Sequence, residues 1–191
     1  MKNYKNTMQK SILVLFVLIS SSLFVGCSDD DDPPAPVNEE EVITTMNVTL
    51  TAAGATAITL QSQDLDGDGP NAPTISVSGD LTASTTYAGT IELLNETESP
   101  AEDITEEVEA EADEHQFIFG PSGSIASIAY TDEDGNGNPV GINFTLTTGD
   151  AGTGSLQITL RHEPTKPNDG TLAGAGGETD IAQTFNLTVV Q

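Results

Sequence analysis

The feature that most limits what this chain can fold into is a two-residue alternation of apolar and polar side chains. It recurs from residue 42 onward, for example in INFTL (142–146) and LQITL (156–160). Neighbouring side chains of a strand point to opposite faces, so this alternation is typical of antiparallel strands with one buried face. The pattern predicts an all-β fold, an immunoglobulin-like antiparallel β-sandwich formed as a single domain by residues 42–191. About nine strands are expected, at 42–51, 55–63, 73–79, 85–95, 115–119, 124–131, 140–147, 152–162 and 181–190.

One segment follows a helical period instead. The sequence SPAE at 99–102 has the form of a capping box with proline at the first helical position. Apolar residues then recur at Ile104, Val108 and Ala112, so we expect one short acidic helix at 100–113. Repulsion between like charges four positions apart should destabilise this helix by about 0.2–0.5 kcal/mol per pair unless packing or cations compensate.

The chain is strongly acidic, because its 191 residues hold 30 acids and five bases, a formal net charge of -25. Three of the bases lie in the first ten residues, so the part after residue 26 carries 2 - 30 = -28. Binding to the phosphates of a nucleic acid requires a surface cluster of lysine and arginine side chains, so the composition excludes a nucleic-acid-binding function. The single cysteine also excludes a disulfide framework and a cysteine-based zinc knuckle.

Residues 1–26 have the organisation of a signal peptide, in which three lysines precede the apolar run ILVLFVLI at 12–19. This run is too short to read as a membrane-spanning helix. The sequence Phe24-Val25-Gly26-Cys27 resembles the bacterial lipoprotein cleavage box, with Phe24 where leucine is more common. The resemblance implies cleavage before Cys27 and acylation of that residue, and several acyl chains anchor a protein stably in a membrane. An ordinary signal peptide followed by a chance cysteine is the alternative.

Residues 27–41 are expected to form a tether. The run SDDDDPPAP at 28–36 joins like charges to prolines and cannot bury apolar surface, which favours an extended segment. It also resembles the acidic export signal that follows the lipid-modified cysteine in surface lipoproteins of Bacteroidota. That resemblance implies attachment to the outer membrane with the domain facing the medium. A plain spacer on the periplasmic side is the alternative.

Two loops match the first half of a calcium-binding loop, in which oxygen ligands alternate along the chain and glycine permits a sharp turn. Their sequences are DLDGDG at 64–69 and DEDGNG at 132–137. Their twelfth positions are Ile75 and Asn143 rather than a bidentate glutamate, and hairpin turns require the same residue types. Weak calcium binding and a purely turn-forming role both stay open. The candidate calcium ligands are Asp64, Asp66, Asp68, Asp132, Asp134 and Asn136.

The two histidines give the most specific prediction. His115 begins one expected strand and His162 ends another, each with the parity of the inward-facing apolar residues of its strand. These are the first and fourth of four successive strands, and in a Greek key the fourth strand lies beside the first. That topology places both imidazoles at one end of one strand pair, with Glu114 and Glu163 beside them. Two imidazoles and a carboxylate suit zinc, copper or iron. A hydrogen-bonded histidine pair without metal is the alternative.

Four segments resemble a group of small flavobacterial lipoproteins, and the similarity extends from the tether to Gln191. Members of that group commonly carry the name type 1 periplasmic binding fold superfamily protein or, less often, GTP cyclohydrolase. The residues argue against both names, because the first fold needs two α/β lobes and the second activity needs a cysteine–histidine zinc set. The resemblance therefore implies a surface location and a binding role. The segments are LLNETESPAEDITEE (93–107), EADEHQF (111–117), LRHEPTKPNDG (160–170) and GGETDI (176–181).

Together these features predict an outer-membrane lipoprotein, exposed at the cell surface, that captures a divalent transition metal, calcium or a small ligand. Its expected partners are the membrane, through the lipid, and a TonB-dependent transporter to which it is an accessory. An acidic surface concentrates cations near the protein. The chain has no nucleophile elbow and no phosphate-binding loop, which favours a non-enzymatic role. The alternatives are a structural or adhesive surface module stabilised by calcium and, more remotely, a hydrolase that uses paired carboxylates.

Overall fold

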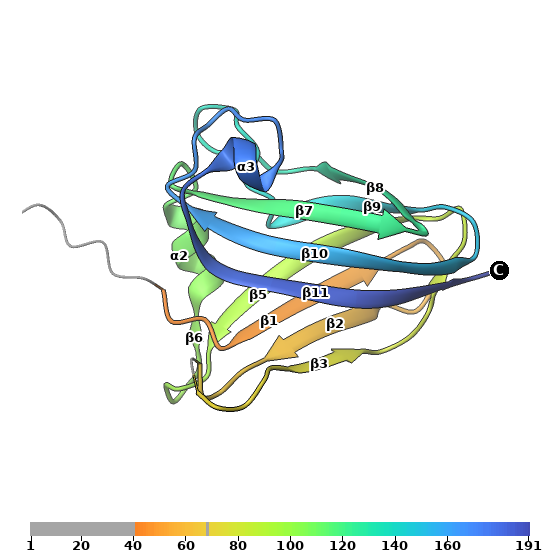
Figure 1. The fold of residues 1–191 in the computed structure, drawn as a ribbon, viewed down its shortest axis with the longest axis horizontal. Helices are drawn as coiled ribbons and strands as arrows, with labels where there is room; N and C mark the ends of the chain where they lie inside the picture. The colour runs from red at the N-terminus through yellow and green to blue at the C-terminus, as the bar shows by residue number, and fades with distance from the viewer. Residues whose placement is uncertain (1–40, 68) are drawn as a thin grey trace, which may run out of the picture. The chain divides into compact units, whose positions relative to one another are not determined.

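Two β-sheets face each other across one apolar core in the computed structural model, which describes residues 41–67 and 69–191 (Figure 1). The signal peptide, Cys27 and the tether up to residue 40 lie outside the described residues, as does Asp68. Within the described part, no helix has the length and apolar character needed to cross a membrane. The strands are β1 (Thr45–Thr51), β2 (Ile58–Gln63), β3 (Thr74–Val77), β4 (Leu81–Thr82), β5 (Thr86–Asn95), β6 (Glu102–Asp103), β7 (His115–Gly123), β8 (Ile125–Tyr130), β9 (Asn143–Thr148), β10 (Gly152–His162) and β11 (Glu178–Val190).

The larger sheet has the order β3-β2-β1-β5-β9-β8, with β6 paired to β5, and the smaller sheet has the order β4-β11-β10-β7. All neighbours are antiparallel except β4 and β11. The predicted all-β sandwich is confirmed, and each of the nine expected strands is present. The two-residue strands β4 and β6 were not expected, because a segment this short has no alternation to recognise.

The pairing of β7 with β10 follows the Greek-key expectation, but the strands between them do not. β8 and β9 pair with each other and belong to the larger sheet, so the chain crosses to the opposite sheet after β7 and returns before β10. The first and fourth strands of this run are nevertheless direct neighbours over nine residue pairs, from Gly154 opposite Gly123 to His162 opposite His115. This register brings the two histidines together.

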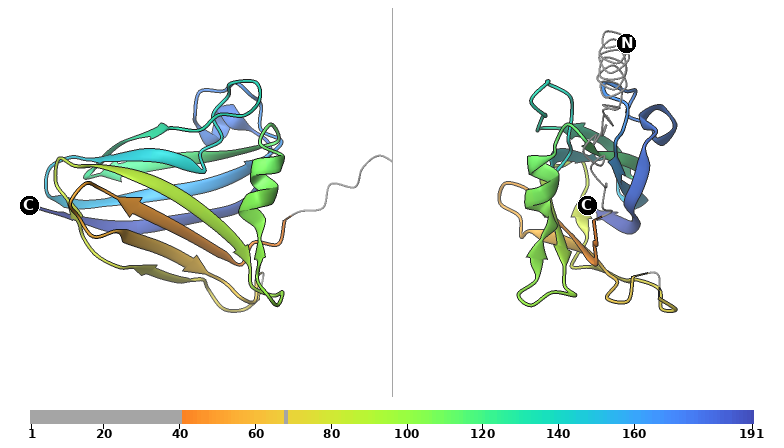
Figure 2. Two further views of the ribbon diagram at one scale, coloured as in Figure 1. Left: turned by 180° about the vertical axis from the view of Figure 1, so that it is seen from behind. Right: turned by 90° about the vertical axis from the view of Figure 1, so that its left-hand side faces the viewer.

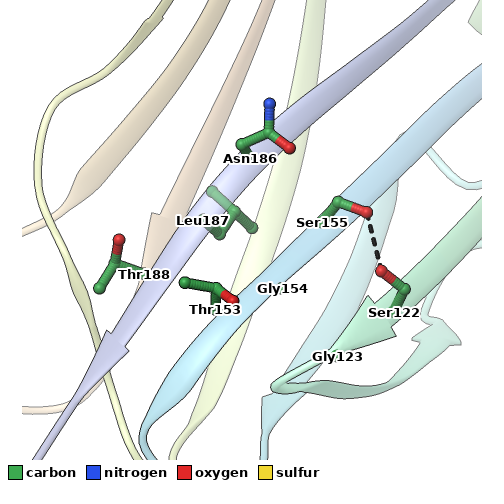
Figure 3. A pocket seen from close by; sticks show the side chains of 8 residues that line it. All are labelled: Ser122, Gly123, Thr153, Gly154, Ser155, Asn186, Leu187 and Thr188. Atoms are coloured by element: carbon green, nitrogen blue, oxygen red, sulfur yellow. Dashed lines mark hydrogen bonds between the residues drawn. The ribbon is translucent and has the colours of Figure 1, made fainter.

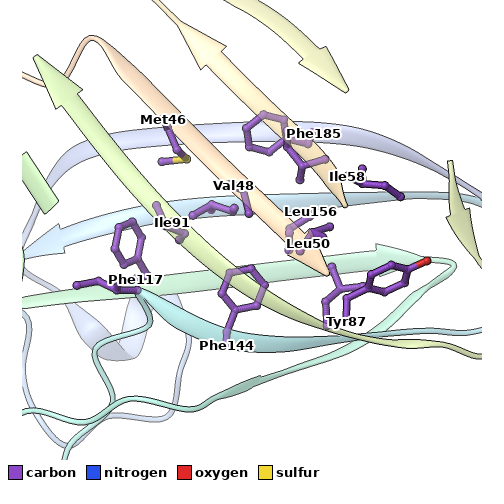
Figure 4. Close-up of a cluster of buried hydrophobic side chains, with 14 of the residues drawn as sticks. Met46, Val48, Leu50, Ile58, Tyr87, Ile91, Phe117, Phe144, Leu156 and Phe185 are labelled. Atoms are coloured by element: carbon purple, nitrogen blue, oxygen red, sulfur yellow. The ribbon is translucent and has the colours of Figure 1, made fainter. Parts of the chain in front are cut away.

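The core consists of the inward-facing residues of both sheets (Figure 4). Burial of one leucine, isoleucine or phenylalanine side chain stabilises a fold by roughly 1.5–3 kcal/mol. One glycine is needed for this packing, because a Cβ at Gly89 would overlap the ring of Phe144 on the neighbouring strand β9. The largest fully buried side chains include Tyr87, Phe117, Phe144, Phe185, Met46, Leu50, Leu60 and Leu81.

The predicted helix is present but shorter than expected. Helix α2 covers Ile104–Ala110, and Asp103 is its N-cap, with a side chain that accepts a hydrogen bond from Thr105 N. The expected capping box at 99–102 was wrong, because Glu102 and Asp103 pair with β5 as strand β6 before the helix begins. The apolar stripe is confirmed, since Ile104 and Val108 are buried against the core. A second helix, α3 (Leu172–Ala175), was not expected.

Candidate metal centre

Four titratable side chains meet at one end of the sandwich. They are Glu41, His115, His162 and Asp180, and one potential ligand atom from each lies within 4.8 Å of those of the other three. All four side chains are at least 97% buried. Among residues 41–67 and 69–191, this is the only group of three or more histidine, cysteine, aspartate or glutamate side chains so arranged. The strand ends that carry it lie beside α2, at the left of Figure 1 and facing the viewer in the right-hand view of Figure 2.

Three members of the group come from neighbouring strands of the smaller sheet. His115 is the first residue of β7, and His162, the last residue of β10, lies directly opposite it. Their rings stack with centroids 4.5 Å apart and planes 29° apart. Asp180 reaches the group through an irregularity in β11. Leu160 pairs with Ile181 and Arg161 pairs with Thr179, so Asp180 is the extra residue of a β-bulge. A bulge redirects a side chain relative to the regular alternation, and here it turns a carboxylate inward.

The fourth member, Glu41, precedes the first strand of the larger sheet. The chain is fixed three residues later at Thr44, whose N–H donates to Leu94 O at 3.0 Å and whose carbonyl accepts from Asp64 N at 2.7 Å. The Thr44 hydroxyl also accepts from Glu96 N at 2.8 Å. These bonds hold the start of β1 against β2 and β5. The group therefore joins the two sheets.

The contacts of His115 require a cation or a shared proton in this group. Its Nδ1 lies 3.2 Å from the carbonyl oxygen of Glu111, which only accepts, so Nδ1 carries a proton. In the neutral ring Nε2 is then an acceptor, yet it lies 2.9 Å from Oε1 of Glu41, which is also an acceptor when ionised. Two acceptors this close need a proton or a metal ion between them. The carbonyl contact at the second ring nitrogen is the arrangement that orients metal-binding histidines in proteins.

One oxygen of Glu41 and one ring nitrogen of His162 make no hydrogen bond within the described residues. Nδ1 of His162 lies 3.7 Å from Oε2 of Glu41 and 3.8 Å from Oδ1 of Asp180, both beyond hydrogen-bond distance. Within the described residues, Oε2 of Glu41 and Nε2 of His162 are buried without a hydrogen-bond partner. A buried polar group without a partner costs free energy of about 1–3 kcal/mol. A ligand that binds here would remove part of that cost.

The expected carboxylates of this site were wrong. Glu114 and Glu163 flank the histidines in the sequence, but both side chains are exposed and neither belongs to the buried group. Both residues lie just outside the strands, Glu114 in the turn before β7 and Glu163 in the bend after β10 with a φ of +47°, and these turns direct the two side chains to solvent. Their backbones still pair, since Glu163 N donates to Glu114 O at 2.7 Å.

The electrostatic potential around the group is negative, because the two basic side chains of the described part form their hydrogen bonds elsewhere. Arg161 donates to the carbonyl oxygens of Gly176 and Gly177 and to the hydroxyl of Thr179. Lys166, the other base of the described part, donates to the Ala112 carbonyl and to Asp134. On α2, burial first and then repulsion from Glu41 and Glu111 raise the pKa of Glu107 above its ordinary value. This field favours a cation over an anion at the site.

The second candidate calcium loop is a turn whose carboxylates are already occupied. Asp132 accepts from Gly141 N and Asn143 N, each at 2.7 Å. Asp134 is buried and accepts from Asn136 N at 2.8 Å, from Asn138 N at 2.9 Å and from the Lys166 ammonium at 3.3 Å. These donors occupy the oxygens that calcium would need. The exposed Asn136 contributes to this turn only through its backbone N–H, which donates to Asp134.

The first candidate calcium loop connects β2 and β3. Asn71 Nδ2 donates to Asp66 at 2.6 Å, and this hydrogen bond holds the pKa of Asp66 below its ordinary value. The carboxylate of Asp64 lies two residues earlier, accepts a long bond of 3.4 Å from Asp66 N and contacts the Asp66 carboxyl. Neither residue belongs to a group of three potential ligands in the described part of the chain.

A hollow on the smaller sheet lies far from the histidines. It measures about 460 Å³ and is lined by residues of β7, β10 and β11, including Ser122, Thr153, Ser155 and Asn186 (Figure 3). The hydroxyls of Ser122 and Ser155 lie 2.8 Å apart. None of its lining residues is charged or a histidine, so it lacks the donors of a metal site.

A close approach of the chain at Gly177 positions His162. Gly177 has a φ of +71°, and a Cβ there would overlap the carbonyl oxygen of His162. We expect Gly177→Ala to reduce the free energy of unfolding by about 1–3 kcal/mol through this overlap, measured by urea denaturation. Gly170→Ala is the control, because Gly170 has a similar φ of +74° but open space around it. Equal destabilisation by both substitutions would contradict the overlap.

Comparison of the chain with protein-family models, curated proteins and solved structures finds no match in any of the three. The four side chains of the buried group, two histidines, a glutamate and an aspartate, could hold a metal ion.

Proposed function

We propose that this domain binds one divalent transition-metal ion, with zinc as the best fit, between His115, His162, Glu41 and Asp180. The observation that carries the proposal is the buried contact of 2.9 Å between His115 Nε2 and Glu41 Oε1, two atoms that need a cation or a proton between them. Imidazole nitrogens suit zinc, copper, iron and nickel, whereas calcium takes six to eight oxygens. A donor set of two nitrogens and two carboxylates therefore favours a transition metal.

The dimensions of the group support zinc. Ligand atoms about 2.0–2.1 Å from a tetrahedral zinc ion lie roughly 3.3 Å apart. The four separations between an imidazole nitrogen and a carboxylate oxygen are 2.9, 3.7, 3.8 and 4.0 Å, and they involve both oxygens of each carboxylate. Shifts of less than about 1 Å would bring each of these pairs to the spacing of a tetrahedral site. The charges also match, since two carboxylates and two neutral imidazoles carry -2 and a divalent cation cancels it.

The number of ligands supports binding over catalysis. Catalytic zinc sites usually keep one position for water or substrate, whereas sites with four protein ligands are closed. All four side chains here are almost fully buried, which leaves little room for a substrate at the metal. The role that fits this arrangement is capture of the metal, or its use to hold the two sheets together.

We further propose that the domain works at the outer membrane, held by acyl chains on Cys27, as an accessory to a TonB-dependent transporter. The support comes from the sequence, namely the cleavage box before Cys27 and the acidic tether after it. Metabolic labelling with a radioactive fatty acid tests the anchor. We expect label in the wild-type protein and none in Cys27→Ala, and label in both would contradict acylation at Cys27.

Isothermal titration of the metal-free protein with zinc tests the metal site. We expect one zinc per chain, and a loss of affinity of at least about 100-fold in Asp180→Asn, because even a residue that only hydrogen-bonds to a metal ligand is worth about 10–100-fold in affinity. Glu178→Gln is the matched control, since Glu178 lies two residues away and is exposed. Binding of equal strength in wild type, Asp180→Asn and His162→Ala would contradict the proposal.

A further inference from the structure

The metal group is approached from one side by a cavity of about 350 Å³. Glu41 and Asp180 line this cavity, whereas His115 and His162 do not. A cation moving inward would therefore meet carboxylates before imidazoles. Glu41 joins the cavity to the group, because this residue lines the cavity and its side chain, 97% buried, lies 3.7 Å from His162 Nδ1.

A third carboxylate lies in the same cavity. Asp64 follows the last residue of β2, and its N–H donates to Thr44 O at 2.7 Å, which ties it to the segment that carries Glu41. Its side chain is half-buried. Its carboxylate accepts a 3.4 Å bond from Asp66 N and also contacts the Asp66 carboxyl, and a cation bound by Asp64 would replace that second contact. Its neighbour Asp66 does not line this cavity.

We propose that the cavity is the route by which the metal ion reaches the buried group, and that Asp64 is a transient first ligand on this route. The inference rests on the metal-binding function proposed above. Apolar side chains, among them Val42, Ile43 and Ile181, form much of the remaining wall. Walls of low dielectric constant concentrate the field of a carboxylate inside a cleft and raise the local concentration of cations.

A transient ligand changes the rates of binding and not its equilibrium. We expect Asp64→Asn to slow zinc association about tenfold. This is the low end of the increases in association rate that electrostatic attraction produces. Dissociation should slow by the same factor, so that the dissociation constant stays within about twofold of wild type. Stopped-flow mixing of the full protein with zinc chloride and a fluorescent zinc chelator measures both rates. Asp64→Glu, which retains the charge, should restore fast association.

Glu178→Gln is the control, because it removes an exposed carboxylate close to Asp180 that does not line the cavity. Equal slowing in Asp64→Asn and Glu178→Gln would overturn the route through the cavity. A weaker dissociation constant in Asp64→Asn with unchanged association would overturn the transient role, since Asp64 would then be a permanent ligand. Absence of zinc binding in the wild-type protein would overturn the proposed function itself. If added salt reduces the slowing in Asp64→Asn, the result supports the inference, because dissolved ions screen the attraction between the carboxylate and the zinc ion.

Discussion

Asp134→Ala is expected to lower the free energy of unfolding by about 3–5 kcal/mol, because it leaves the buried ammonium of Lys166 without its counter-charge. The side chains of Asp134 and Lys166 are 0% and 6% exposed and lie 3.3 Å apart. Lys166 also donates to the Ala112 carbonyl at 2.6 Å, so it joins the turn after β8 to the end of α2. Urea denaturation at neutral pH measures the loss. Glu133→Ala is the control. It removes the exposed carboxylate of the preceding residue and should change the free energy of unfolding by less than about 0.5 kcal/mol.

The contribution of Asp134 should also depend on pH in a defined window. Burial raises the pKa of its carboxyl, but hydrogen bonds from Asn138, Asn136 and Lys166 outweigh burial and lower the pKa from 3.8 to about 2. A pKa lowered by folding means that the ionised form stabilises the fold. The contribution is complete above the ordinary pKa of 3.8 and is lost as the pH falls through about 2. The stability difference between wild type and Asp134→Asn should shrink across this window. A difference that stays constant down to pH 2 would contradict this account.

Zinc is expected to stabilise the protein by about 2.7 kcal/mol when its free concentration is 100 times the dissociation constant. For a domain of this size each kcal/mol raises the melting temperature by roughly 2–4 °C, so we expect an increase of about 5–11 °C. The physical reason is that the ion would join Glu41, ahead of the larger sheet, to three ligands of the smaller sheet. Differential scanning calorimetry with zinc, with calcium and with EDTA measures the effect.

Two comparisons make this thermal experiment specific. Glu41→Gln should lose most of the increase, whereas Glu178→Gln should keep it. Calcium should have a much smaller effect than zinc, since the group offers only two carboxylates and two nitrogens. An equal increase with calcium, or an increase that survives Glu41→Gln, would favour a calcium-stabilised surface module and contradict a zinc site at these residues.

The strands were predictable because burial of one face of a sheet imposes the two-residue period directly on the sequence. The apolar stripe of α2 was predictable for the same reason, since Ile104 and Val108 follow the helical period. The first residue of α2 was not predictable, because Asp103 and Ser99 are both good N-caps. Which of them caps the helix depends on the pairing between β6 and β5. The exchange of β8 and β9 to the larger sheet also depends on tertiary packing, which local patterns do not contain.

Half of the candidate site was predictable. His115 and His162 followed from strand parity and from the pairing of the first and fourth strands. Asp180 was not, because its even position in β11 predicts an outward side chain until the bulge is known. Glu41 was assigned to the tether, since it ends the acidic run NEEE that follows the prolines and such a run resembles solvated chain. A carboxylate one residue before the first apolar position was the only available signal.

X-ray absorption spectroscopy at the zinc edge of the zinc-loaded protein shows which atoms bind the ion. We expect four nitrogen and oxygen ligands at about 2.0–2.2 Å, two of them with the outer-shell scattering of imidazole. In His162→Ala the imidazole signal should fall to one ring. A shell of oxygen atoms without imidazole scattering, or a spectrum that His162→Ala leaves unchanged, would show that zinc binds elsewhere and would contradict the site.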